Sequence, residues 1–163
     1  MNWERNEHIV KISKKIYPKI NKLEVPLFFV LALVTSLKEF TNLPVTIFII
    51  AITGVLACLY FLGAFYPKDS NIYSNGAQSI IKVCMISLSV GLLGIMYKIL
   101  HLPGALQMLV AATATMLVGF VTSLYYKYKT PEVTLFDNRM LLRMLIIGGI
   151  CAILLLLSVI NKF

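Results

Sequence analysis

Apolar residues gather in five long segments, and most polar residues fall between them. The segments are Val25–Leu37, Phe40–Tyr66, Val83–Tyr97, Leu102–Tyr126 and Met144–Asn161. A helix needs about 20 predominantly apolar residues to cross a bilayer. The second and fourth segments exceed this length. The third and fifth reach it when Lys82, Lys98 and Arg143 at their ends extend toward the interface. The first segment is shorter, and it either crosses with help from its flanking residues or is re-entrant.

The distribution of positive charge favours five crossing segments. With a cytoplasmic N-terminus and five crossings, 12 Lys and Arg residues lie on the cytoplasmic side and 3 on the other. The cytoplasmic set is Arg5, Lys11, Lys14, Lys15, Lys19, Lys22, Lys68, Lys82, Lys127, Lys129, Arg139 and Arg143, and the other is Lys38, Lys98 and Lys162. Since cytoplasmic flanks are enriched in Lys and Arg, the sequence predicts a bacterial inner-membrane protein with a cytoplasmic N-terminus and a periplasmic C-terminus. A re-entrant first segment would remove the bias.

Residues 8–24, ahead of the first apolar segment, predict an amphipathic helix. Apolar residues recur there at helical spacing with five lysines between them: Ile9, Ile12, Ile16, Ile20 and Leu23. A basic amphipathic helix of this kind lies in the interface of an anionic leaflet, and Pro18 should kink it. The alternative use of this helix is as a docking surface for a cytoplasmic partner.

Composition narrows the class of protein further. Of the 163 residues, 59% are hydrophobic and 13% are charged, whereas a soluble domain carries about 25% charged residues. The sequence therefore predicts an all-α polytopic membrane protein. The net charge of +8 does not indicate nucleic-acid binding, because the basic residues flank apolar segments and form no face with interleaved aromatics. Cys58, Cys84 and Cys151 lie inside apolar segments, where they are expected to pack as small apolar residues.

A turn motif occurs twice, 59 residues apart. The motif Lys98-x-x-His101-Leu102-Pro103-Gly104 follows the third apolar segment, and Glu39-x-x-Asn42-Leu43-Pro44-Val45 follows the first. The same shift brings Phe61 onto Phe120, Tyr66 onto Tyr125 and Lys68 onto Lys127. We therefore predict five transmembrane helices: two repeated helical hairpins, 25–66 and 79–127, and a fifth helix at 139–161. The alternative is that any two membrane hairpins share aromatic belts and prolines.

The paired turns contain the candidate functional residues. The repeat puts Glu39 and Lys98 at equivalent positions, where they could form an ion pair, and His101 and Asn42 at the two turn apices. Because an imidazole gains and loses a proton near neutral pH, His101 could relay protons. The structural alternative is that His101 caps a helix and Lys98 anchors it at the interface, since polar residues cost least at such ends. Pro44, Pro103 and Gly104 are expected to shape the turns.

Small residues on two segments predict close helix packing. Thr115, Gly119 and Ser123 recur every four residues, and Gly148 and Gly149 lie in the fifth segment. Such residues allow transmembrane helices to approach closely. No carboxylate is expected deep in a span, and no metal-binding, phosphate-binding or nucleophile motif is present in the sequence. We therefore expect no enzyme, no metal and no cofactor.

The stretch from Met96 to Ala105 resembles a turn that is common in inner-membrane proteins of Bacteroidota, Phe-Lys-x-x-His-Trp-Pro-Gly-Ala. The best-known carriers form the GldL/PorL family of the type IX secretion and gliding motor. In that family a helical hairpin with a cytoplasmic extension surrounds a GldM/PorM partner in a proton-driven motor. The resemblance covers residues 87–126, and only the ten-residue turn within it is specific.

Carried over to this chain, the Lys and His of that motif are Lys98 and His101, and Pro103 and Gly104 belong to its turn. The chain departs from the motif at Leu102, where the family has Trp, and at the preceding Phe position, which is Tyr here. It also lacks the acidic residue of the following helix and the long cytoplasmic extension. The resemblance thus implies a relative of the hairpin and not the motor subunit itself.

Together these features predict a non-enzymatic subunit of a larger membrane assembly, linked by the resemblance to type IX secretion or gliding. Its expected contacts are the lipid bilayer and either a membrane-protein partner or a second copy of the chain. The alternative is conduction of protons, ions or small solutes through a mouth lined by Glu39, Lys98 and His101. A membrane enzyme or quinone-binding subunit is a third reading, supported only by aromatic residues at the segment ends.

Overall fold

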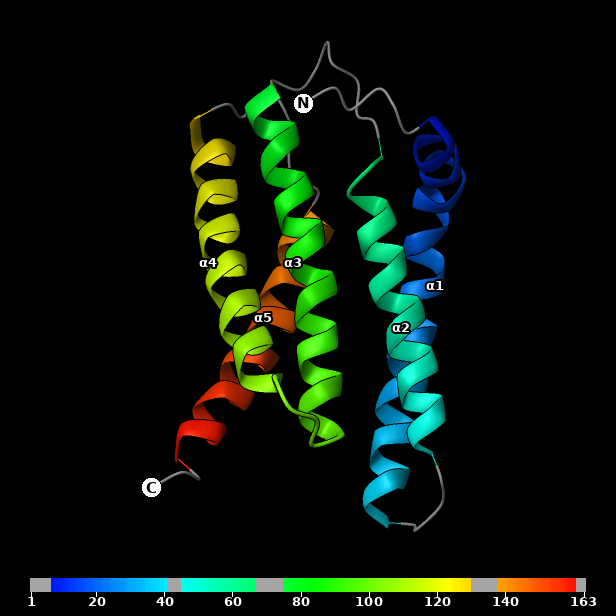
Figure 1. Cartoon of the computed structure of the whole chain (residues 1–163). Coiled ribbons are helices and arrows are strands. Elements are labelled where there is room, and N and C mark those ends of the chain that lie inside the picture. The colour runs from blue at the N-terminus through cyan, green and yellow to red at the C-terminus, as the bar shows by residue number, and fades with distance from the viewer. Residues whose placement is uncertain (1–6, 41–44, 67–74, 130–137, 161–163) are drawn as a thin grey trace.

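The computed structural model describes residues 7–40, 45–66, 75–129 and 138–160, and all regular secondary structure in these ranges is helical. The helices are α1 (Glu7–Phe40), α2 (Thr46–Gly63), α3 (Asn75–Ile99), α4 (Ala105–Lys129) and α5 (Asn138–Ile160). Figure 1 shows them side by side as a bundle. Four of them, α2 to α5, are long and apolar enough to cross a membrane, and α1 makes a fifth if its two limbs form one span. The predicted all-α fold is confirmed for the described residues, and its apolar helices are consistent with a membrane protein.

Helix α1 is bent, and the bend divides it into two limbs. Val10–Tyr17 and Lys22–Lys38 meet at 77°, with Pro18 between them. Proline removes a backbone donor and clashes with the preceding turn, so a bend at this position follows from the sequence. The second limb begins at Lys22 and not at residue 25, where the first hairpin was expected to start. The basic first limb therefore runs nearly at right angles to the second.

The first limb of α1 packs on the end of α2. Ser13 Oγ donates a hydrogen bond to the carbonyl oxygen of Leu62 at 2.8 Å. The rings of Tyr17 and Tyr66 stack with their centroids 4.2 Å apart. Ile20 is buried, while the described lysines Lys11, Lys14, Lys15, Lys19 and Lys22 are exposed. The predicted amphipathic pattern is therefore used partly for packing within the protein.

Helix α3 is the centre of the bundle, in contact with α2, α4 and α5. One face of it is fully buried over its length: Ile81, Cys84, Met85, Leu88, Leu92 and Met96. Close approach depends on two glycines. A Cβ on Gly91 would lie 2.5 Å from Met116 Cε, and a Cβ on Gly119 would lie 2.6 Å from Cys84 Sγ. Helices α3, α4 and α5 thus meet where small residues make room for sulfur-containing side chains.

The ends of the helices follow the predicted repeat. A shift of 59 residues carries Phe40, the end of α1, onto Ile99, the end of α3, and Thr46, the start of α2, onto Ala105, the start of α4. The ends of α1 and α3 lie at the same end of the bundle (Figure 1). Lys38 Nζ donates a hydrogen bond to the carbonyl oxygen of Ile99 at 2.7 Å. The ends of α1 and α3 are therefore neighbours in space.

Candidate functional site: a buried carboxylate, tyrosine and guanidinium

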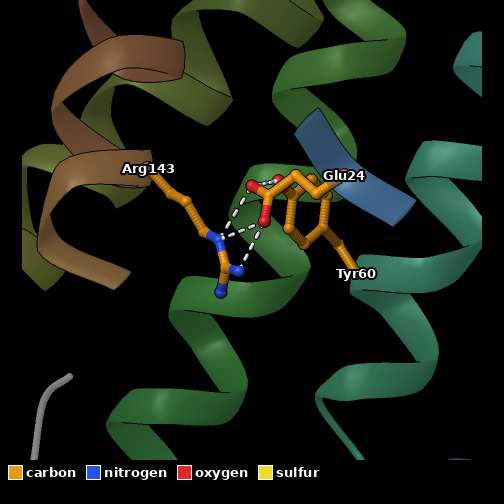
Figure 2. A network of polar contacts seen from close by, with 3 residues as sticks. All are labelled: Glu24, Tyr60 and Arg143. Atoms are coloured by element: carbon orange, nitrogen blue, oxygen red, sulfur yellow. Dashed lines mark hydrogen bonds and ion pairs between the residues drawn. The ribbon is translucent and has the colours of Figure 1, made fainter. Parts of the chain in front are cut away.

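Three helices bring one polar network into the apolar bundle (Figure 2). Glu24 lies on the second limb of α1, Tyr60 one turn before the end of α2, and Arg143 in the second turn of α5. On the second limb of α1, Glu24 shares the buried face with Leu31, since a spacing of seven residues returns to one side of a helix. The carboxylate is therefore carried inward by the same periodicity that buries its apolar neighbours.

Glu24 is the centre of the network. The guanidinium of Arg143 donates to both carboxylate oxygens, from Nε at 2.8 Å to each and from Nη2 at 2.5 Å to Oε2. Tyr60 Oη donates to Oε1. Arg143 also lies over the Tyr60 ring, with Cζ 5.9 Å from the centroid. All these donors point at one acceptor group, an arrangement that suits an ionised carboxylate.

The network is buried, which makes its pairing important. Glu24 is 8% exposed and Tyr60 is 1% exposed, and the side chains of the ion pair are 10% and 12% exposed. Tyr60 and Arg143 both fall within helices long and apolar enough to cross a membrane, about one turn from the ends of those spans. A charge in such surroundings is costly unless it is paired. The pair therefore fixes how α1 and α2 sit against α5.

A groove opens beside this network, between α1 and α5. It has a volume of about 690 Å³. Its lining residues from the two helices are Glu24, Val25, Phe28, Ala32, Arg139, Leu142, Arg143, Ile146 and Ile147. The groove combines apolar walls with charged groups, as ligand sites commonly do.

In the turn between α3 and α4, His101 has an unusual backbone conformation. His101 has φ of 55°, the left-handed conformation that most residues avoid. Its N–H bonds the carbonyl of Lys98 at 3.2 Å, and the N–H of Leu102 bonds that of Tyr97 at 2.8 Å. These two bonds are those of a Schellman motif, which ends a helix by satisfying its last carbonyls. His101 is exposed and occupies the C′ position of this motif, just past the end of α3.

The other predicted turn residues are partly described. A pocket of about 530 Å³ gathers Lys98, His101, Pro103 and Gly104 with Ser158 of α5. Gly104 has φ of 86°, which glycine adopts readily. Glu39 is in the last turn of α1, but its side chain lies outside the described part of the structure, as do Asn42 and Pro44 entirely. The ion pair between Glu39 and Lys98 stays a prediction.

The predicted packing residues of α4 divide into two groups. Gly119 is buried against Cys84, and Ser123 is fully buried with its hydroxyl 2.5 Å from the carbonyl oxygen of Gly119. Thr115 is exposed and bonds the carbonyl of Ala111 in its own helix at 2.7 Å. The three-residue stripe does not pack as one unit, because a four-residue period drifts around a helix of 3.6 residues per turn.

The glycine pair of α5 divides in the same way. A Cβ on Gly148 would meet Met116 Sδ at 3.3 Å, while a Cβ on Gly149 would meet nothing within 4 Å. Gly149 therefore faces away from the bundle. Of the cysteines, Cys84 and Cys151 are buried and Cys58 is exposed, and all three are free. The first two pack as expected of small apolar residues.

Sequence reasoning missed the network itself. It expected no carboxylate deep in a span and treated Arg143 as an extension of the fifth segment. The signal was available: Glu24 and Arg143 each stand directly before an apolar segment, and the predicted topology puts both segments' starts on the same side. Two opposite charges at matching depth could have been paired on that basis.

No family model, curated protein or solved structure matches this chain. The relation of the turn at residues 96–105 to the GldL/PorL family thus stays an expectation from the sequence.

Proposed function

We propose that this protein is a non-enzymatic subunit of a larger assembly in a bacterial inner membrane, crossing it five times with its N-terminus in the cytoplasm and its C-terminus in the periplasm. The observation that carries the proposal is the buried network, which ties α1 and α2 to α5 through Glu24, Tyr60 and Arg143. A fixed α5 presents its outer face in one orientation, as a docking surface requires.

The outer face of α5 supports this role. Apolar residues at spacings of three and four residues are exposed along it, with Gly149 in the middle: Leu142, Leu145, Ile153, Leu156 and Ile160. Spacings of three and four residues are typical of the contact face between paired helices. The open space around Gly149 would let a second helix approach closely, which is how small residues promote helix association in membranes. We therefore place the partner's transmembrane helix along this face.

Site-specific photo-crosslinking tests the proposal. A photoreactive residue at Ile153 should give a discrete adduct of higher mass than the monomer in native membranes. Gly149→Leu should reduce this adduct strongly while leaving the monomer folded, because nothing lies within 4 Å of the added Cβ. Gly54→Leu is the matched control, since Gly54 on α2 is equally open, and it should leave the adduct unchanged. Lipid adducts alone at Ile153 would contradict the proposal.

The link to type IX secretion or gliding is a finer part of the proposal, supported by the turn that contains Lys98 and His101. Mass spectrometry of the Ile153 adduct tests it separately. A partner from that machinery would support the link. A partner from any other system would reject the link and leave the subunit role intact.

The buried carboxylate favours proton conduction as a second candidate. Conduction through membrane proteins generally uses an acid inside the protein, and Glu24 is such an acid. Glu24, and not only Lys98 and His101, would then carry protons. Purified protein in liposomes should show proton flux that Glu24→Gln abolishes. Flux no greater than that of empty liposomes would reject this function.

A further inference from the structure

The groove between α1 and α5 is polar at one end and apolar at the other. On α1, Glu24 is followed at four-residue intervals by Phe28 and Ala32, and on α5 the two arginines precede Ile146 and Ile147. The second limb of α1 and α5 run in the same direction in Figure 1. The charged ends of both walls therefore lie together, and the apolar ends lie together.

The groove is about one leaflet deep. Its lining spans nine residues on α1, from Glu24 to Ala32, and nine on α5, from Arg139 to Ile147. The eight steps between the first and last residue, at 1.5 Å each, cover about 12 Å, less than half of the ~30 Å hydrocarbon core. A transmembrane helix would need a seam along most of the core, whereas a lipid fills one leaflet.

The net positive charge of the groove lining favours an anionic lipid headgroup. Arg139 and Arg143 contribute two positive charges and Glu24 one negative charge, so the lining has a net charge of +1. Arg139 is exposed, at the first turn of α5, where the span meets the interface. Guanidinium groups recognise phosphate oxygens through directed hydrogen bonds. An anionic headgroup at this end and an acyl chain along the apolar walls match both features.

We propose that the α1–α5 groove is a binding site for an anionic membrane lipid, with the phosphate at Arg139 and an acyl chain along Phe28, Ala32 and Ile146. This site adjoins the docking face on α5, with which it shares Leu142, and it does not require the proposed subunit role. It borders the buried network, so a bound lipid would cover Glu24 and Arg143 from the membrane side.

Native mass spectrometry of the detergent-purified protein tests the site, with equimolar phosphatidylglycerol and phosphatidylcholine as probes. The wild-type protein should retain phosphatidylglycerol in preference to phosphatidylcholine. Arg139→Gln should lower this preference about fivefold, the effect of one arginine near a membrane surface. Ala32→Phe, which fills the apolar end, should abolish retention of both lipids.

Two matched variants separate this site from general lipid contact. Lys82→Gln removes a positive charge from α3, and Ala114→Phe adds the same bulk to an exposed position of α4. Neither residue lines the groove, so both variants should bind like the wild type. Equal preference in all the variants would overturn the proposal. Disulfide crosslinking of two copies of the chain through Ala32→Cys would also overturn it, since the groove would then hold a second protein chain.

Discussion

The network of Glu24, Tyr60 and Arg143 makes a quantitative prediction about stability. Breaking a buried ion pair by removing one partner costs about 3–5 kcal/mol, because the remaining charge stays buried without compensation. The side chains of the pair are only 10% and 12% exposed, so this range applies to Glu24→Gln and Arg143→Gln. Tyr60→Phe removes one hydrogen bond to a charged group and should cost less, about 1.5–3 kcal/mol.

A double-mutant cycle isolates the pair. In the variant carrying both Glu24→Gln and Arg143→Gln no charge is left unpaired, so it should lose about 2–3 kcal/mol less than the sum of the single losses. The measurement is equilibrium unfolding in mixed micelles of a mild detergent and dodecyl sulfate, followed by circular dichroism. Lys14→Gln is the control, because it removes an exposed positive charge from the first limb of α1 and should change stability by less than about 0.5 kcal/mol.

The coupling energy decides whether the network is structural. Exposed ion pairs contribute about 0–1 kcal/mol. A coupling below about 0.5 kcal/mol between Glu24 and Arg143, with single variants as stable as the wild type, would refute the conclusion that the pair holds α1 against α5.

Three further predictions follow from the described geometry and the proposed topology. His101→Gly should raise the free energy of unfolding by about 1 kcal/mol, because glycine adopts the left-handed conformation without the penalty that His101 bears; His101→Val should lower it in the same unfolding assay. Gly119→Val should cost about 1–3 kcal/mol through contact with Cys84, whereas Gly149→Val should stay within about 0.5 kcal/mol of the wild type. With the native cysteines removed, a cysteine at Thr41 should react with an impermeant reagent from the periplasmic side; labelling only from the cytoplasmic side would refute the crossing of the first segment.

The helices could be predicted from the sequence because hydropathy and length are local properties. The apolar segments predicted the four candidate spans α2 to α5. The paired turn motifs predicted where α1 and α3 end and where α2 and α4 begin, since Pro and Gly interrupt helices at those places. The role of His101 could be stated only as an alternative. Its left-handed backbone conformation depends on φ, which only the described turn supplies, and a proton relay through its imidazole stays a prediction.

Packing partners were harder to predict because they depend on rotation of each helix about its axis. Thr115 and Gly119 share a motif, yet one is exposed and the other is buried. Gly148 and Gly149 are adjacent, and only the first meets another helix. A one-residue step turns a helix by about 100°, so a stripe in the sequence does not determine which of its members touch a neighbour.

The missed network shows how matched charges should be sought in a membrane protein. The pairing of Glu39 with Lys98 rests on a repeat that puts them at equivalent positions and stays a prediction; both are expected at an interface, where pairing is worth little. No repeat relates Glu24 to Arg143. Each stands directly before an apolar segment, and the predicted topology has both segments enter the membrane from the same side. Arg143 lies one turn inside its span, where an unpaired charge costs more than at the end of a span, so it needs a partner such as Glu24. Opposite charges that begin segments entering from the same side are therefore to be paired, as well as those that an internal repeat makes equivalent.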